Sequence, residues 1–259
     1  MGESGDLVLL EVREAVAVIT LNRPAVHNAI SDAMRGFISR AFDEAAARED
    51  VRCVLLRGAG KSFCAGRDVR ELGARGEGVT HEAYIAAAQA IRLKQYALRK
   101  PSVAALRGHV IGGGAEMALA ADVRVVAEDL RFSLPEVRYG LALDTGGSAM
   151  LTALLGPARA KWLMMSGDPI GAQEAVAWGL AEWSVPPEAL DARAFEIARR
   201  LASLPPGAVA AQKGLVEAVL GDAVRTAMAR ELAAQSELFL GDEYLALKRA
   251  RTEGRDSRD

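Results

Sequence analysis

Cysteine is scarce in this chain, which has only Cys53 and Cys64 among its 259 residues. Two cysteines are too few for the disulfide framework that holds a small secreted protein together. Residues 1–6 carry two acidic side chains and no apolar run, which argues against a secretory signal. From these absences we expect an intracellular protein, and we assign it to the cytoplasm.

An excess of charge of one sign is also absent. The 32 Lys and Arg side chains are matched by 34 Asp and Glu side chains, which gives a formal net charge of −2 at pH 7. A protein whose main partner is duplex DNA needs a broad basic face, so we expect no nucleic-acid partner. Apolar residues make up 51% of the chain and charged residues 25%, the balance of an ordinary globular protein.

Long hydrophobic runs are missing as well. The most apolar stretch, residues 110–127, is interrupted by Glu116, Asp122 and Arg124. Each of these charges is costly at bilayer depth, so we expect no membrane segment. The length is at the upper end for a single core, and we expect one domain or one domain with an appendage.

What the sequence does contain is a regular alternation of apolar runs and helical patterns. Runs rich in Val, Ile and Leu predict strands at residues 7–12, 16–21, 51–56, 103–106 and 122–127. The first two runs are separated by residues 13–15 alone, which makes a hairpin plausible. Helical patterns follow from Asp32, from His81 and from the glycines at 112–114. This alternation predicts an α/β fold with a mostly parallel sheet covered on both faces.

The later part of the chain has a different pattern. From Thr145 onward it is almost purely helical, with breaks at Gly-Pro and Pro-Pro pairs. We therefore divide the chain into an α/β core over residues 1–200 and a C-terminal helical region over residues 201–259. We expect this region to pack on the core and on neighbouring subunits. Residues 60–78 have no periodicity and predict a long loop.

Three segments stand out by their residue types. Residues 63–69 follow a predicted buried strand, residues 108–116 contain a glycine triplet that enters a helix, and residues 132–141 contain Pro135-Glu136. Glycines let another molecule approach the backbone, and a helix N-terminus carries free N–H groups, so the triplet at 112–114 can form an anion or oxyanion site. A tight strand-to-helix turn would account for the same three glycines equally well.

Together, these segments resemble the crotonase superfamily, the enoyl-CoA hydratases and isomerases. The signature of this superfamily runs from a glycine triplet through Glu and a Pro-Glu pair to a second glycine cluster. The matching segments are 111–116, 120–124, 132–141 and 146–147, with further similarity at 20–24, 28–29, 63–68 and 175–180. The resemblance spans residues 7–249. It implies a crotonase-like ββα spiral core with a C-terminal helical trimerisation region.

The resemblance also implies the partners of the chain. The expected substrate is a coenzyme A thioester, and no tightly bound cofactor is expected. The histidines His27, His81 and His109 are scattered, with no ligand spacing, so we expect no metal site. The C-terminal helices imply a homotrimer, or a hexamer built as a dimer of trimers.

Two backbone N–H groups, those of Arg67 and Gly113, are implied to face the thioester oxygen. Preorganised donors stabilise the enolate-like oxyanion that forms during reaction, and removal of one typically costs about 2.7–4 kcal/mol of barrier. Because the donor is a backbone group, the Arg67 side chain is left to meet a coenzyme A phosphate or to be solvated.

Coenzyme A contacts are implied for Arg23, Ala65, Gly66, Asp68, Phe239 and Lys248. Phe239 and Lys248 would reach coenzyme A in a neighbouring subunit, although a basic helix end could instead only oppose the helix macrodipole. A net charge of −2 is compatible with this polyanionic ligand if Arg23, Arg67 and Lys248 meet its phosphates locally. The pocket for the acyl tail is expected from the variable loop 73–90 and from side chains elsewhere in the chain.

Two acids, Glu116 and Glu136, occupy the positions that carry Glu in hydratases. Hydration needs such a pair, because water must lose a proton at C3 while C2 gains one, and each transfer contributes about 10²–10⁴-fold. Their environments must then push the two pKa values apart, or one of the two acids must stay protonated. The structural alternatives are that Glu116 complements a helix dipole and that Glu136 is a capping acid after Pro135.

Asp144 departs from the hydratase pattern, which often has Pro-Gly at this place. An acid here is a feature of dienoyl-CoA isomerases and other isomerases, although dienoyl isomerases usually carry Asp at the position of Glu116. Asp144 would alternatively cap the helix that opens at 145–147. The sequence thus predicts an enoyl-CoA hydratase. Its alternatives are a double-bond isomerase that uses Asp144 and a catalytically silent acyl-CoA-binding protein.

Overall fold

The computed structural model describes residues 7–73 and 76–256 of the chain, with side chains as far as residue 251. Of the segment expected to build the acyl pocket, residues 74–75 lie outside the described residues. The rest of that segment is a loop that leads into a helix beginning at His81. No helix among the described residues is both long and apolar enough to cross a membrane.

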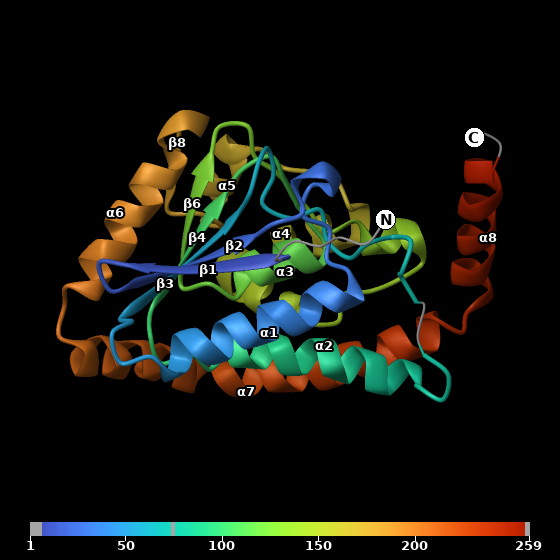
Figure 1. Ribbon diagram of the computed structural model, residues 1–259. Coiled ribbons are helices and arrows are strands. Elements are labelled where there is room, and N and C mark those ends of the chain that lie inside the picture. Colours follow the sequence, from blue (N-terminus) through green and yellow to red (C-terminus); the bar gives the residue numbers. More distant parts are fainter. Residues whose placement is uncertain (1–6, 74–75, 257–259) are drawn as a thin grey trace.

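A six-stranded sheet forms the centre of the molecule, in the order β1-β2-β3-β4-β6-β8 (Figure 1). Its strands are β1 (Val8–Arg13), β2 (Val16–Leu21), β3 (Cys53–Gly58), β4 (Ser102–Leu106), β6 (Val123–Ala127) and β8 (Trp183–Val185). The β1–β2 pair is antiparallel and the other pairs are parallel. The expected hairpin is present, with Glu14 and Ala15 at positive φ angles of 48° and 62° in its turn, the geometry of a type I′ turn.

Strand β8 was not expected in the part of the chain after Thr145, which the sequence predicts to be almost purely helical. It has three residues, Trp183–Val185, and pairs with β6 at the edge of the sheet. Its side chains are largely exposed rather than buried. Such a short exposed segment leaves no apolar pattern in the sequence, so only its pairing with β6 identifies it as a strand.

A second sheet carries the segments that were singled out in the sequence. Strands β5 (His109–Ile111) and β7 (Arg131–Ser133) pair in parallel, and each follows a strand of the main sheet. Single bridges extend this sheet from Cys64 to Val110 and from Phe132 to Ile170. Two strands followed by a helical segment therefore occur twice in succession, and this is the ββα arrangement expected of a crotonase-like core.

Helices cover both faces of the main sheet, as Figure 1 shows. The helices are α1 (Asp32–Ala47), α2 (His81–Tyr96), α3 (Gly113–Leu119), α4 (Gly147–Ser166), α5 (Ala172–Trp178), α6 (Leu190–Ala202), α7 (Pro206–Leu238) and α8 (Asp242–Asp256), with 3-10 turns η1 (Pro24–Val26), η2 (Pro135–Tyr139) and η3 (Pro187–Ala189). Helix α6 packs on β2, β3, β4 and β6. The larger core lies on the opposite face and includes residues of α1, α3 and α4.

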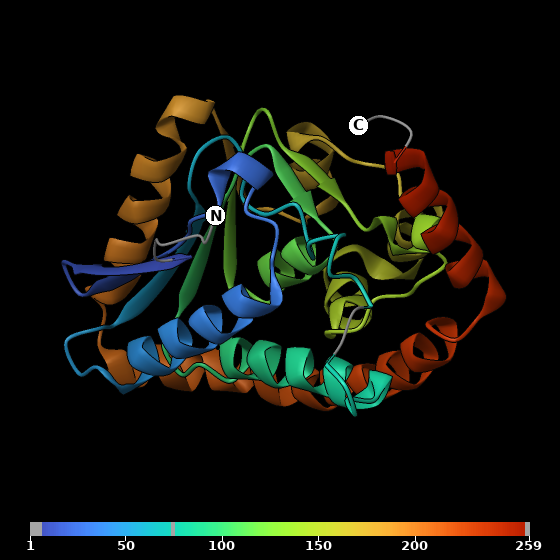
Figure 2. The same ribbon diagram turned by 45° about the vertical axis from the view of Figure 1, so that its right-hand side comes forward.

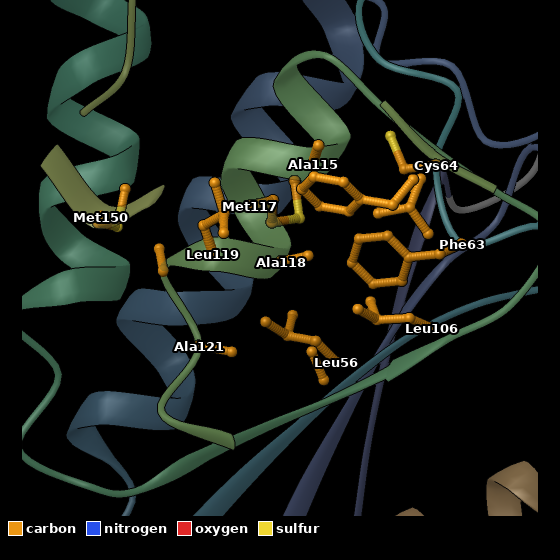
Figure 3. Close-up of a cluster of buried hydrophobic side chains, with 14 of the residues drawn as sticks. Leu56, Phe63, Cys64, Leu106, Ala115, Met117, Ala118, Leu119, Ala121 and Met150 are labelled. Atoms are coloured by element: carbon orange, nitrogen blue, oxygen red, sulfur yellow. The ribbon is translucent and has the colours of Figure 1, made fainter. Parts of the chain in front are cut away.

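Helix α3 is held firmly by this larger core. Figure 3 shows its side chains Ala115, Met117 and Ala118 beside Phe63 and Leu106, which come from the loop after β3 and from β4. All five side chains are at most 1% exposed. Burial of large apolar side chains contributes about 1.5–3 kcal/mol each. The glycine triplet at the start of α3 therefore rests on a rigid support.

The long helix α7 runs along α2, and α8 then turns away from its end (Figures 1 and 2). On α7, Leu215, Val216 and Val219 are 66%, 60% and 79% exposed. Apolar side chains exposed together in this way mark an interaction surface. Helix α8 packs back on η2 of the same chain.

A pair of glycine substitutions tests the packing under α3. Ala at Gly114 would place its Cβ 2.6 Å from the Cys64 carbonyl oxygen and 2.7 Å from the Cys64 Cβ, whereas Ala at Gly214 in α7 meets nothing within 4 Å. We expect Gly114→Ala to lower the free energy of unfolding by about 1–3 kcal/mol through overpacking. Gly214→Ala should raise it by up to about 1 kcal/mol through helix propensity. Urea unfolding measures both, and equal effects of the two substitutions would contradict the described packing.

Candidate active site

The loop after β3 presents a backbone donor at Arg67. The neighbouring residues are tied down by hydrogen bonds from Ala65 N to His27 O (2.9 Å) and from Ile30 N to Gly66 O (2.7 Å). Gly66 has a φ of +87°, and a Cβ there would lie 2.7 Å from the Ile111 carbonyl oxygen, so only glycine fits. Within the described residues, the N–H of Arg67 donates to no protein acceptor.

The second donor comes from the N-terminus of α3. Gly113 is the first residue of that helix, so its N–H has no partner within the helix. The ideal Cβ position of Gly66 is 3.6 Å from the Gly113 nitrogen, which shows how closely the two loops approach. The structure thus brings the Arg67 and Gly113 donors to one place, and this arrangement can hold an oxyanion.

Glu116 is buried, at 1% exposure, on α3. Its Oε1 accepts hydrogen bonds from Thr145 N (2.9 Å) and Gly147 N (3.1 Å) at the start of α4. The carboxyl group of Glu116 therefore interacts with the N-terminus of α4, and not only with the dipole of its own helix α3. A Cβ at Gly147 would lie 2.8 Å from Glu116 Oε1, so the glycine at 147 makes room for this contact.

Glu231, on α7, was not predicted from the sequence. Its carboxylate accepts from the two backbone donors at the start of α4 that Glu116 leaves unused, Gly146 N at 2.6 Å and Ser148 N at 3.0 Å. Its Oε1 also accepts from Ser148 Oγ at 2.5 Å. No local signal distinguishes Glu231 from the other acids of a 33-residue helix. Only the packing of α7 against α4 brings it to the site.

The two predicted acids have perturbed pKa values. Burial, together with the charges of Asp144 and Glu231, raises the pKa of Glu116 from 4.5 to about 7. Burial also raises the pKa of Glu136 well above 4.5, assisted by the charge of Glu116. Glu136 lies on η2, whose N-terminus has no side-chain cap, and its buried Oε2 has no hydrogen-bond partner in the described structure. Glu136 is therefore not a capping acid.

Asp144 is not the cap of α4 either, and the Arg67 side chain is neither solvated nor directed to an open surface. Asp144 Oδ1 and Oδ2 both lie 2.6 Å from Arg67 Nη2, and the two side chains are 5% and 13% exposed. The N-cap of α4 is Gly146, and no side chain of the N-cap bonds the helix. The donors that Asp144 would have capped are used by Glu116 and Glu231.

These groups share one small cavity of about 70 Å³. Its polar lining includes the predicted catalytic set, Arg67, Gly113, Glu116, Glu136 and Asp144. Its apolar lining includes Val69, Leu72, Ile111, Tyr139 and Leu141. Perturbed acids, convergent backbone donors and an apolar wall in one cavity are the features of a catalytic site.

Arg92 of α2 is a second buried cation near this cavity that the sequence did not reveal. It is 6% exposed, and its Nη2 donates to Gly113 O at 3.3 Å. Burial lowers the pKa of Arg92 to about 10, and the charge of Glu116 opposes that shift. Arg92 thus supports the first turn of α3, where the Gly113 donor lies.

The residues predicted to bind coenzyme A fall into two groups. Ala65 and Gly66 line the cavity. Arg23 and Asp68 instead contact each other, with Arg23 Nη1 3.3 Å from Asp68 Oδ2 and 2.6 Å from Ala29 O. Both side chains are at most 10% exposed, so this pair braces the loop that carries Arg67.

Phe239 and Lys248, which the resemblance implies to reach coenzyme A in a neighbouring subunit, lie at the end of α7 and on α8. Phe239 is 2% exposed, because its ring stacks on His81 at 4.8 Å and meets Tyr244 edge-on at 5.1 Å in the same chain. Tyr244 Oη also donates to Leu72 O at 3.2 Å. Lys248 is exposed on α8, 5.8 Å from the Tyr244 ring. In this chain Phe239 is thus a packing residue behind the cavity wall.

Comparison with known proteins agrees with this fold. The family model for enoyl-CoA hydratase/isomerase matches residues 11–251. The chain belongs to the enoyl-CoA hydratase/isomerase family. The "Short-chain-enoyl-CoA hydratase" of Clostridium acetobutylicum is 34% identical over 233 residues, 90% of this chain and 89% of that protein.

Two further proteins show how far the similarity extends. A protein of Rhodobacter capsulatus named "Probable enoyl-CoA hydratase" is 37% identical over 231 residues, 88% of each chain. The crystal structure of an enoyl-CoA hydratase/isomerase from Xanthobacter autotrophicus Py2 superposes with a TM-score of 0.86 at 30% identity and covers 98% of both chains. The similarity therefore includes the C-terminal helices as well as the core.

Proposed function

We propose that this protein is an enoyl-CoA hydratase that adds water syn across the C2=C3 double bond of a 2-enoyl-CoA thioester. The observation that carries the proposal is that Glu116 and Glu136 line one cavity with the Arg67 and Gly113 backbone donors. The names of the relatives support it, since several are called enoyl-CoA hydratases. A coenzyme A thioester is the substrate, and no tightly bound cofactor is needed for this chemistry.

Each group has a role in the proposed mechanism. The thioester oxygen accepts hydrogen bonds from the Arg67 and Gly113 N–H groups. Glu116 takes a proton from water as the water oxygen bonds to C3, and the π electrons move toward the thioester oxygen. The resulting enolate then takes a proton at C2 from Glu136. Before the next turnover, the proton gained by Glu116 must return to Glu136.

The raised pKa values suit these roles. Burial raises the pKa of Glu136 well above 4.5, a shift in the direction that favours the protonated form required of the acid. Glu116, with a pKa of about 7, can exist as the carboxylate that accepts a proton at neutral pH. An acid and a base of this kind each contribute about 10²–10⁴-fold.

A panel of acyl-CoA thioesters tests the proposal. We expect loss of the conjugated enoyl absorbance with at least one short, medium or long 2-enoyl-CoA, with a product heavier by one water in the mass spectrum. Persistence of the absorbance across the panel, with intact binding, would instead identify a catalytically silent acyl-CoA-binding protein.

Double-bond isomerisation is a second candidate because Asp144 lines the same cavity. A third carboxyl group near the acyl tail could move a proton between distant carbons. The ion pair with Arg67 weighs against this role, since proton uptake by Asp144 would break it. A 3-enoyl or 3,5-dienoyl thioester in the same panel distinguishes the two reactions, because isomerisation leaves the mass unchanged.

We also propose that the chain assembles as a trimer, or as a hexamer of two trimers, through its C-terminal helices. The exposed apolar residues Leu215, Val216 and Val219 of α7 support an interface there. Light scattering should give the mass of a trimer or hexamer, and Val219→Glu should shift it toward the monomer. Leu9→Glu, at an exposed apolar position of β1, is the matched control. A monomeric wild-type protein would refute this assembly.

A further inference from the structure

Arg67 contributes to the site at two points. Its main-chain N–H is one of the two donors proposed to face the thioester oxygen. Its guanidinium extends to Asp144, 77 residues further along the chain, and Nη2 lies 2.6 Å from both carboxylate oxygens. The buried ion pair therefore connects the loop after β3 that carries Arg67, called the oxyanion loop below, to the segment that precedes α4.

Apart from this ion pair, the backbone hydrogen bonds next to Arg67 hold the oxyanion loop only on the side of Ile30. Backbone hydrogen bonds hold the residues on either side of Arg67, from Ile30 N to Gly66 O (2.7 Å) and from Asp68 N to Ile30 O (2.9 Å). These bonds tie the loop to the segment 27–30 on one side. On the side of the cavity, the ion pair between the Arg67 side chain and Asp144 holds the loop.

Asp144 is itself held in place by hydrogen bonds that involve α2 and α7. Its main-chain oxygen accepts from Gln89 Nε2 at 2.9 Å, and the same amide group donates to Met228 O at 2.7 Å. Gln89 of α2 thereby links the main chain of Asp144 to Met228 of α7. The side chain of Asp144 is 5% exposed, so the ion pair is protected from competition by water.

We infer that Asp144 is a positioning residue of the hydration reaction: through the Arg67 side chain it orients the Arg67 N–H toward the thioester oxygen. This inference rests on the proposed function. It differs from both roles that the sequence suggested for Asp144. The α4 donors are occupied by Glu116 and Glu231, and Asp144 is held in an ion pair that proton uptake would break.

The orientation of the donor can be measured without turnover. The absorption of a conjugated, chromophoric enoyl-CoA thioester shifts to the red when its carbonyl oxygen accepts hydrogen bonds. We expect this shift on binding to the wild-type protein and a smaller shift with Asp144→Asn. Full removal of an oxyanion donor costs about 10²–10³-fold in kcat, so a misdirected donor should cost about 10–100-fold, with KM changed less than threefold.

Three variants separate positioning from other roles. Glu116→Gln should lose turnover while it keeps the full red shift. Asp144→Glu keeps the charge and should recover part of the shift. Arg67→Met retains the backbone donor but lacks the ion pair. The double variant Arg67→Met/Asp144→Asn should lose no more activity than Arg67→Met alone, because both changes break the same contact.

The outcomes are distinguishable from failure of the proposed function. If the wild-type protein does not hydrate enoyl thioesters, the proposed function fails, while the red shift still reports the donors. An unchanged red shift in Asp144→Asn, or a loss in the double variant equal to the product of the single losses, would overturn the positioning role. If Asp144→Asn alone does not fold, the double variant, which leaves no unpaired charge, supplies the red-shift measurement.

Discussion

Replacing Glu136 by Gln is expected to lower kcat for hydration by about 10²–10⁴-fold, with a much smaller change in KM. Gln has nearly the same size as Glu, so it fits the same buried position, but it cannot deliver a proton to C2. Burial raises the pKa of Glu136 well above 4.5, which favours the protonated form that this substitution removes. Steady-state kinetics with a short 2-enoyl-CoA measures the effect.

The matched control for this substitution is Glu128→Gln. Glu128 is exposed after β6 and lies outside the cavity lining. It should leave kcat and KM within twofold of the wild-type values, since exposed substitutions have small effects. Retention of wild-type kcat by Glu136→Gln would remove Glu136 from the mechanism.

Replacing Glu116 by Gln is expected to have an effect of similar size and also to change the pH profile. In the wild-type protein, kcat/KM should rise as the pH increases through about 7, because Glu116 must lose its proton to act as the base. Glu116→Gln should lower kcat by about 10²–10⁴-fold and abolish this rise. A pH–rate profile of both proteins measures it, and an unchanged rise in the variant would show that another group is the base.

Stability provides an independent readout for Glu116. Its pKa is raised from 4.5 to about 7 by burial and by neighbouring negative charges, so between these values the folded protein holds a proton that the unfolded chain releases. That contribution to stability is present below the unfolded pKa and is lost as the pH rises through the folded value. Glu116→Gln has no such loss. Its Tm relative to the wild type should therefore increase from about pH 5 to about pH 8.

The start of α4 explains why the site can hold so many acids. Glu116 and Glu231 divide four successive backbone donors between them, and the positive end of the helix macrodipole favours negative charge there. Arg67 balances Asp144 directly. Burial raises the pKa of the remaining acid, Glu136, and its Oε2 has no hydrogen-bond partner among the described residues.

Much of the fold could be predicted because it depends on local patterns. The buried strands at 16–21 and 103–106 are continuous apolar runs, and the glycine triplet at 112–114 marks the entry to α3. Strand β8 could not be predicted, since its three residues are too exposed to show a pattern. The prediction of a loop over residues 73–90 was wrong from His81 onward, where α2 begins. The Thr80 side chain caps this helix by accepting from Ala83 N.

The candidate site was predictable only where a motif carried it. Arg67, Gly113, Glu116 and Glu136 lie within motif segments, and the structure places all four on one cavity. Glu231 depends on the packing of α7 and Arg92 on that of α2, and neither has a local signal. Asp144 was found, but its partner was not, because an ion pair across 77 residues leaves no trace in sequence spacing. The packing of Phe239 inside its own chain was missed for the same reason.

Hydration of crotonyl-CoA in water enriched in ¹⁸O tests the central claim most directly. The account predicts a product heavier by one water, with one ¹⁸O atom in the new C3 hydroxyl group, and a rate that falls by about 10²–10⁴-fold in both Glu116→Gln and Glu136→Gln. A product of unchanged mass, or labelled product formed at the wild-type rate by either variant, would contradict it.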